Sequence, residues 1–207
     1  MAAVTSDQQV ANMALGHCGQ RQTIDSLLEN STEALACRTY FATVKQSMLQ
    51  EMNWPWAQKR ASLALLSGVE VEGWAYAYAA PSDLLNADAI ERIESGAQVD
   101  VEPIPYSLEL NAAGNQFIIA TDAELPELVY TRDVPFALWP AKAVKACAAA
   151  LAVDIALMLP VKPELAAGLN GIAKQLLSEA LAASGNATNQ RPIQNAEVIR
   201  RRGFLSR

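Results

Sequence analysis

Residues 31–60 read STEALACRTYFATVKQSMLQEMNWPWAQKR, and this stretch shows where the chain turns from helix to strand. Ser31 or Thr32 can cap a helix, because a hydroxyl there accepts a hydrogen bond from a free amide of the first turn. Apolar residues then recur at steps of three and four, which predicts one apolar helix face about five turns long. They are Ala34, Cys37, Phe41, Val44 and Met48.

The end of this helix is set by the sequence Trp54-Pro55-Trp56. Pro55 lacks an amide hydrogen and disfavours helical geometry in the residue before it, so the helix should end by Asn53. A strand-like run, 61–66, follows at once. We therefore expect Trp54 and Trp56 to form a structural corner between helix and strand, with Trp54 largely buried.

The middle of the chain, residues 59–133, is built from short runs bounded by Gly, Pro, Asn or Asp. Strand candidates are 61–66, 74–79, 89–93, 107–110, 116–121 and 128–131. Their close spacing without helices predicts antiparallel pairing in one small sheet, because a parallel crossover needs a dozen or more residues. Pro103 and Pro105 exclude 99–106 from a central strand, so this part should be an edge or a projecting loop.

Helical periodicity is found both before and after this middle region. A short first helix should end at Gly16, and two apolar stripes after Trp139-Pro140 predict an αα-hairpin whose second helix begins at Pro163. The predicted fold class is α+β: an antiparallel-packed helical bundle with a small inserted antiparallel β domain and an extended C-terminal arm. Its parts are 1–58 (N-terminal helices of the bundle), 59–133 (β domain), 134–185 (helical hairpin completing the bundle) and 186–207 (basic arm).

Charge is unevenly distributed along the 207 residues. The chain has a net charge of −6, whereas residues 186–207 carry five Arg and one Glu, so the rest sums to −10. An acidic body repels phosphate, which argues against duplex binding by counterion release. The arm combines a basic cluster with an apolar pair, and these residues are candidate contacts with a neighbouring subunit or another protein partner: Arg200, Arg201, Arg202, Phe204 and Leu205.

Residues typical of catalysis, cofactor binding or metal binding form no recognisable pattern. The sequence has no Gly-rich phosphate loop and no Gly-x-Ser-x-Gly turn, and its one histidine, His17, favours a structural role over a metal site. Cys18, Cys37 and Cys147 are widely spaced, which predicts reduced core thiols. We expect no catalytic residue, no cofactor and no metal. The N-terminus lacks a signal-peptide pattern, and the most apolar window, 143–159, contains Lys145 and Asp154, so no membrane span is predicted.

The order of several motifs resembles the tail tubular protein A family, the head–tail adaptors of short-tailed bacteriophages. The matching residues cover about 8–183: Met13-Ala14-Leu15-Gly16, Ile24-Asp25-Ser26-Leu27, Glu33-Ala34 to Tyr40, Trp54-Pro55-Trp56-Ala57 with Lys59-Arg60, Tyr76-Ala77-Tyr78 with Pro81-Ser82-Asp83, and Tyr130-Thr131-Arg132-Asp133. Trp56 stands where Phe is more usual in the family, and the arm 186–207 matches no family pattern.

The resemblance implies a structural virion protein without enzymatic activity. Family members combine a helical bundle with a small β domain and form a twelve-fold homo-oligomeric ring at the head–tail junction, assembled in the host cytoplasm. The implied partners are the portal protein, the tail nozzle or tube protein, and double-stranded DNA that passes without sequence-specific binding. Two alternatives stay open: a head completion or connector protein of a long-tailed phage, and a cytosolic enzyme with Cys18 or Cys37 as nucleophile.

Overall fold

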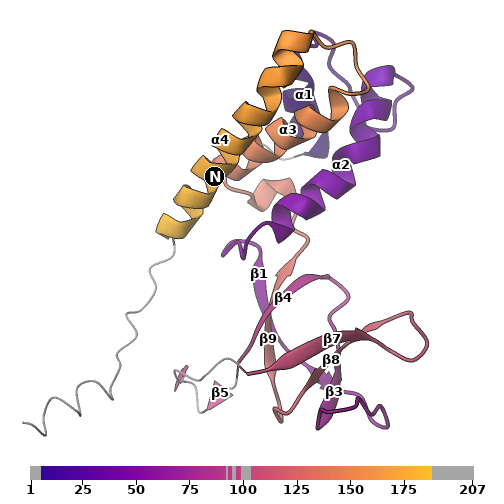
Figure 1. The fold of residues 1–207 in the computed structure, drawn as a ribbon, viewed down its shortest axis with the longest axis vertical. Coiled ribbons are helices and arrows are strands. Elements are labelled where there is room, and N and C mark those ends of the chain that lie inside the picture. The colour runs from indigo at the N-terminus through magenta and orange to yellow at the C-terminus, as the bar shows by residue number, and fades with distance from the viewer. Residues whose placement is uncertain (1–5, 92, 95–96, 99–103, 188–207) are drawn as a thin grey trace, which may run out of the picture.

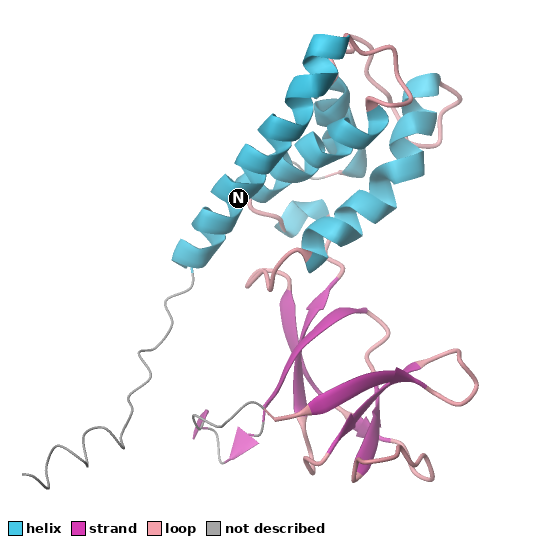
Figure 2. Cartoon of the chain, in the orientation of Figure 1, coloured by secondary structure: helices cyan, strands magenta, loops and turns pink. Residues whose placement is uncertain are grey.

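The computed structural model describes residues 6–91, 93–94, 97–98 and 104–187, and it divides into a helical part and a strand part (Figure 1). The helices gather at one end of the molecule and the strands at the other (Figure 2). The helices are α1 (Asp7–His17), α2 (Thr32–Gln50), the short 3-10 helix η1 (Phe136–Leu138), α3 (Ala141–Ile155) and α4 (Pro163–Ala187). The strands all fall between α2 and η1, so the predicted α+β class with an inserted β domain is confirmed.

The N-terminal helices start where side-chain caps are available. The Ser31 hydroxyl accepts a hydrogen bond from the Ala34 amide at 3.1 Å, and Ser6 caps α1 in the same way. α1 continues past Gly16, at which we expected it to end. The residue in left-handed geometry is instead Gly19, with φ +74°, where a Cβ atom would approach Leu165 to 3.2 Å.

α3 is the central helix of the bundle and contacts each of the other three helices (Figure 1). Its sequence is alanine-rich, and small side chains let neighbouring helix backbones approach closely. Nine of its residues are buried, including Cys147, Leu151 and Ile155. α4 packs against α3 as the predicted αα-hairpin, and Pro163 occupies its first position as expected.

The β domain contains two sheets and a short ribbon rather than the one sheet expected from sequence. Strand order is β1 (Gln58–Ser62), β9 (Glu127–Arg132), β4 (Leu84–Glu91) in the first, and β2 (Ala64–Leu65), β3 (Tyr76–Ala79), β8 (Phe117–Thr121), β7 (Tyr106–Leu110) in the second. β5 (Ile93–Glu94) pairs with β6 (Ala97–Gln98). Every pairing is antiparallel.

The two sheets share a small hydrophobic core. Ile119 of the second sheet packs with Ile90, Leu128 and Tyr130 of the first, and all four are buried. Each sheet covers the large apolar side chains of the other. A single sheet would leave one face of these side chains in water. β7 is an edge strand that begins directly after Pro105, in keeping with the proline rule, although 99–103 lie outside the described residues.

The junction between the two parts contains the tryptophan corner. Trp54 has no exposed surface, and its indole N–H donates to the Met48 carbonyl at 2.7 Å, which satisfies a free carbonyl near the end of α2. The Trp56 ring lies 5.4 Å from the Trp54 ring and 4.9 Å from that of Trp139, between centroids. The three tryptophans thus join the chain segments that enter and leave the β domain.

Two further boundaries differ slightly from the sequence expectation. β1 begins at Gln58, and α4 extends to Ala187, two residues beyond the expected end of the hairpin. The arm candidates Arg200, Arg201, Arg202, Phe204 and Leu205 lie outside the described residues. Within the described part of the chain, no helix is both long and apolar enough to cross a membrane.

Candidate assembly site

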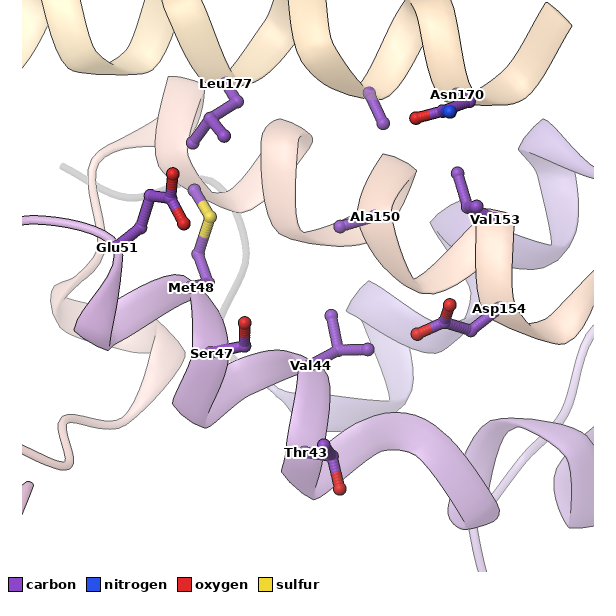
Figure 3. Close-up of a pocket in the computed structure, with 11 residues that line it drawn as sticks. Thr43, Val44, Ser47, Met48, Glu51, Ala150, Val153, Asp154, Asn170 and Leu177 are labelled. Atoms are coloured by element: carbon purple, nitrogen blue, oxygen red, sulfur yellow. The ribbon is translucent and has the colours of Figure 1, made fainter.

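A groove with an aliphatic floor runs across one side of the helical bundle (Figure 3). Helices α2 and α4 form its walls and α3 its floor, and its volume is about 300 Å³. The aliphatic side chains in its middle come from all three helices: Val44, Met48, Ala150, Val153 and Leu177. They form an apolar strip along the middle of the groove.

Carboxylates stand at both ends of this groove. Figure 3 shows Asp154 at one end and Glu51 at the other, while Asn170 extends from α4 across the groove from Asp154. Neither carboxylate has an ion-pair partner among the described residues, and no Lys or Arg lines the groove. Partial burial raises the pKa of the Asp154 carboxyl, because the charged form loses hydration without gaining a cation. The groove therefore favours a partner that is apolar and positively charged.

Sequence reasoning missed this groove, although one of its signals was visible. Asp154 interrupts the most apolar window of the chain, which we interpreted only as evidence against a membrane span. The α2 residues that line the groove with it lie more than 100 positions earlier in the sequence, and the α4 residues lie 16 to 23 positions later. Only the packing of the three helices brings them together.

A smaller cavity of about 220 Å³ lies against the tryptophan corner. Trp54, Trp56, Pro140, Ala180 and Ser184 line it, among others. The Trp56 indole N–H and the Ser184 hydroxyl are buried, and neither has a hydrogen-bond partner in the described part of the chain. Burying two polar atoms without hydrogen bonds destabilises the fold. The Trp56 indole N–H therefore differs from that of Trp54, which donates a hydrogen bond.

The surface of the β domain is strongly acidic. Residues 59–133 contain 13 Asp and Glu against four Lys and Arg, a net charge of −9, whereas 1–58 and 134–185 together sum to −1. Lys59 pairs with Asp83 at 3.2 Å, and Arg60 pairs with Glu91. Lys45 of α2 pairs with Asp133 as well, so three carboxylates of this domain have an ion-pair partner among the described residues.

Apolar side chains also remain exposed along the second sheet. Leu110 and Phe117 face each other across β7 and β8 and are each about half exposed, at 55% and 52%. Leu65 and Leu108 are exposed on the same sheet. Exposed apolar side chains on one sheet are suited to a contact with another protein surface.

The cysteines lie in the bundle core, as expected for structural thiols. All three are free and buried. Burial raises the pKa of Cys18 and Cys37 to about 11 and that of Cys147 to about 12, so the reactive thiolate is scarce near neutral pH. Cys18 donates its S–H to the Ala152 carbonyl.

His17, the last residue of α1, is partly buried. Burial lowers the pKa of its imidazole, because the charged form is less well hydrated. Among residues 6–91, 93–94, 97–98 and 104–187, no group of three or more His, Cys, Asp or Glu side chains is placed to hold a metal ion.

Comparison of the chain with models of known protein families and with curated proteins gave no match.

Proposed function

We propose that this protein is an adaptor-ring subunit that joins the portal to the tail tube or nozzle of a short-tailed bacteriophage, and that it forms part of the DNA channel. The observation that carries the proposal is the architecture: an αα-hairpin and two N-terminal helices form one bundle, and a small antiparallel β domain is inserted between them. The motif resemblance implies this arrangement in this chain order.

The charge distribution supports a channel role for the β domain. A surface with net charge −9 repels the phosphate backbone, so DNA passing it would not be held. Sequence-specific duplex readers instead concentrate Lys and Arg on one face. In the proposed ring, the acidic β domain is the part that faces the DNA, and the nearly neutral bundle forms contacts between protein subunits.

The state of the thiols supports a structural role over the enzyme alternative. A cysteine nucleophile needs an accessible thiolate, usually with a base nearby. Cys18, which caps the end of α1, and Cys37, on the buried face of α2, are both in the core with pKa values near 11.

The test is assembly with the portal protein of the same phage. Light scattering of the adaptor alone, the portal alone and the mixture should show a complex several subunits larger than the portal, and electron microscopy of that complex should show an added ring. A protein that stays monomeric in the mixture would overturn the proposal. A ring that instead binds connector proteins of a long-tailed phage would favour the alternative of a head completion protein.

A further inference from the structure

We propose that the groove between α2, α3 and α4 is the receptor for the C-terminal arm of a second copy of this chain. The guanidinium groups of the arm pair with Asp154 and Glu51, and Phe204 and Leu205 cover the aliphatic floor. The inference deepens the proposed ring function and rests on it, because it needs neighbouring copies to meet.

The first argument is charge complementarity. The groove has a carboxylate at each end and no cation on its walls. The arm after Ala187 carries five Arg and one Glu within 20 residues. Guanidinium–carboxylate pairs with parallel hydrogen bonds are strong when both groups are partly removed from water, and Asp154 is already partly desolvated. The cavity at the tryptophan corner has the opposite character, since Lys142 lines it and no carboxylate does.

The second argument is length. Thr43 and Glu51 mark the two ends of the α2 wall, eight residues apart, which is about 12 Å of helix. Four residues of extended chain span about the same length. Residues 202–205 have the sequence Arg-Gly-Phe-Leu and match the length and the apolar floor of the groove. Arg202 before the apolar pair and Arg207 after it supply one cation for each end.

The third argument concerns symmetry. The arm and the groove are different surfaces, so a contact between the arm of one copy and the groove of the next is heterologous. Repetition of a heterologous contact with a closing rotation generates a ring. A groove filled by the chain's own arm would leave each copy closed and would not contribute to a ring.

The test uses full-length chains with single added cysteines. Ser47→Cys places a thiol in the exposed wall of the groove, and Ser206→Cys places one directly after Phe204 and Leu205. The two variants, one with a size tag, are mixed with and without the portal and treated with a short bismaleimide. The native thiols are buried and contribute little background. Ser67→Cys, exposed in a turn of the β domain, is the matched control for Ser47→Cys.

We expect a cross-linked heterodimer with Ser47→Cys and at least about tenfold less with Ser67→Cys. Asp154→Asn in the groove chain should lower the yield roughly tenfold, because a charged hydrogen bond is lost, and added salt should also lower it. Glu179→Gln, which removes an exposed α4 carboxylate bonded to Gln175 outside the groove, should leave the yield unchanged.

Each contrary outcome has a distinct meaning. A third protein that carries both Ser47→Cys and Ser206→Cys tests for docking within one chain. If it cross-links within the chain and the mixed single variants do not cross-link, the arm occupies its own groove and the inference is overturned. A ring on the portal without the heterodimer would overturn the inference and leave the adaptor function standing. Absence of both ring and heterodimer would overturn both.

Discussion

The helical bundle and the β domain of this protein differ in what they bury and in what they expose. Among the described residues, the buried cluster of the bundle contains 29 side chains, whereas the cluster between the two sheets contains four. The β domain in turn carries nearly all of the negative charge outside the arm, −9 against −1 for the helical segments. Because buried apolar area stabilises a fold, we infer that the bundle provides most of the stability and that the β domain mainly presents a charged surface.

The junction between the two parts is held by polar contacts as well as tryptophans. Lys45 of α2 pairs with Asp133, just after β9, at 2.6 Å, and its side chain is only 14% exposed. The Gln50 amide donates to the Leu85 carbonyl at 3.1 Å. These contacts fix the β domain against one end of α2, so any ring built from the bundle would present each β domain at a defined angle.

The largest effect on stability is expected from Trp54→Ala, on the bundle side of the junction. This substitution tests whether the bundle provides most of the stability. Removal of a fully buried indole should cost about 3–5 kcal/mol, because a cavity forms and the Met48 carbonyl loses its donor. Thermal unfolding followed by circular dichroism should show a steep fall in Tm. Trp56→Phe is the matched control: it keeps a ring and removes an unpaired N–H, so stability should be unchanged or higher. Wild-type stability in Trp54→Ala with loss of assembly would show that Trp54 is an interface residue.

A second substitution, Ile119→Ala, tests whether the β domain can unfold separately. This side chain is fully buried between the sheets, and its truncation should cost roughly 2–4 kcal/mol. Because the core there is small, we expect hydrogen exchange to accelerate in strands β3, β8 and β9 while α3 stays protected. The control is Leu110→Ala on the same sheet, about half exposed, which should change little. Equal acceleration in α3 would show that the two parts unfold as one unit.

The two parts should also respond oppositely to acid. Burial acts to raise the pKa of Asp83, but hydrogen bonds from Tyr130 and Lys59 outweigh it, and the net pKa lies below its usual 3.8. A lowered carboxyl pKa stabilises the fold above the unfolded value and is lost as pH falls through the folded one. For Asp154 in the bundle the pKa is raised, so protonation there favours the folded state as pH falls.

Variants at these two carboxyls separate the opposing effects. Denaturant unfolding at about pH 5 and about pH 3 should show a smaller loss of stability in Asp83→Asn than in wild type, and a larger loss in Asp154→Asn. Both effects should be small, since both groups are partly exposed. Identical pH dependence in the three proteins would contradict the assignment.

The smallest effect on stability is expected from removal of residues 188–207, which follow the last described residue of α4. The Tm should stay at the wild-type value, because the described core makes its contacts without the arm. Attachment to the portal or to a neighbouring copy should weaken, and more so at low salt, where the wild-type arm binds best. Unchanged attachment at every salt concentration would show that the arm takes no part in assembly.

Local patterns in the sequence were enough to predict the elements and their class. Helix periodicity, the hydroxyl at Ser31 and the proline at 55 set the extent of α2, and Pro163 set the start of α4, because caps and proline act within a few residues. Alternation identified most strands within a few residues. Charge counting alone separated the basic arm from the acidic body.

Strand partners and surface grooves were decided only by the tertiary structure. β9 pairs with β1 and β4, so β8 and β9 lie in different sheets although only five residues separate them. Alternation of apolar and polar residues identifies a strand but not the strand that it pairs with. Pairing depends on which apolar side chains are buried together. For the same reason Asp154 could be recognised as an interruption of an apolar helix, while its position in a groove with Glu51 arose from the packing of α2 against the distant α3–α4 hairpin.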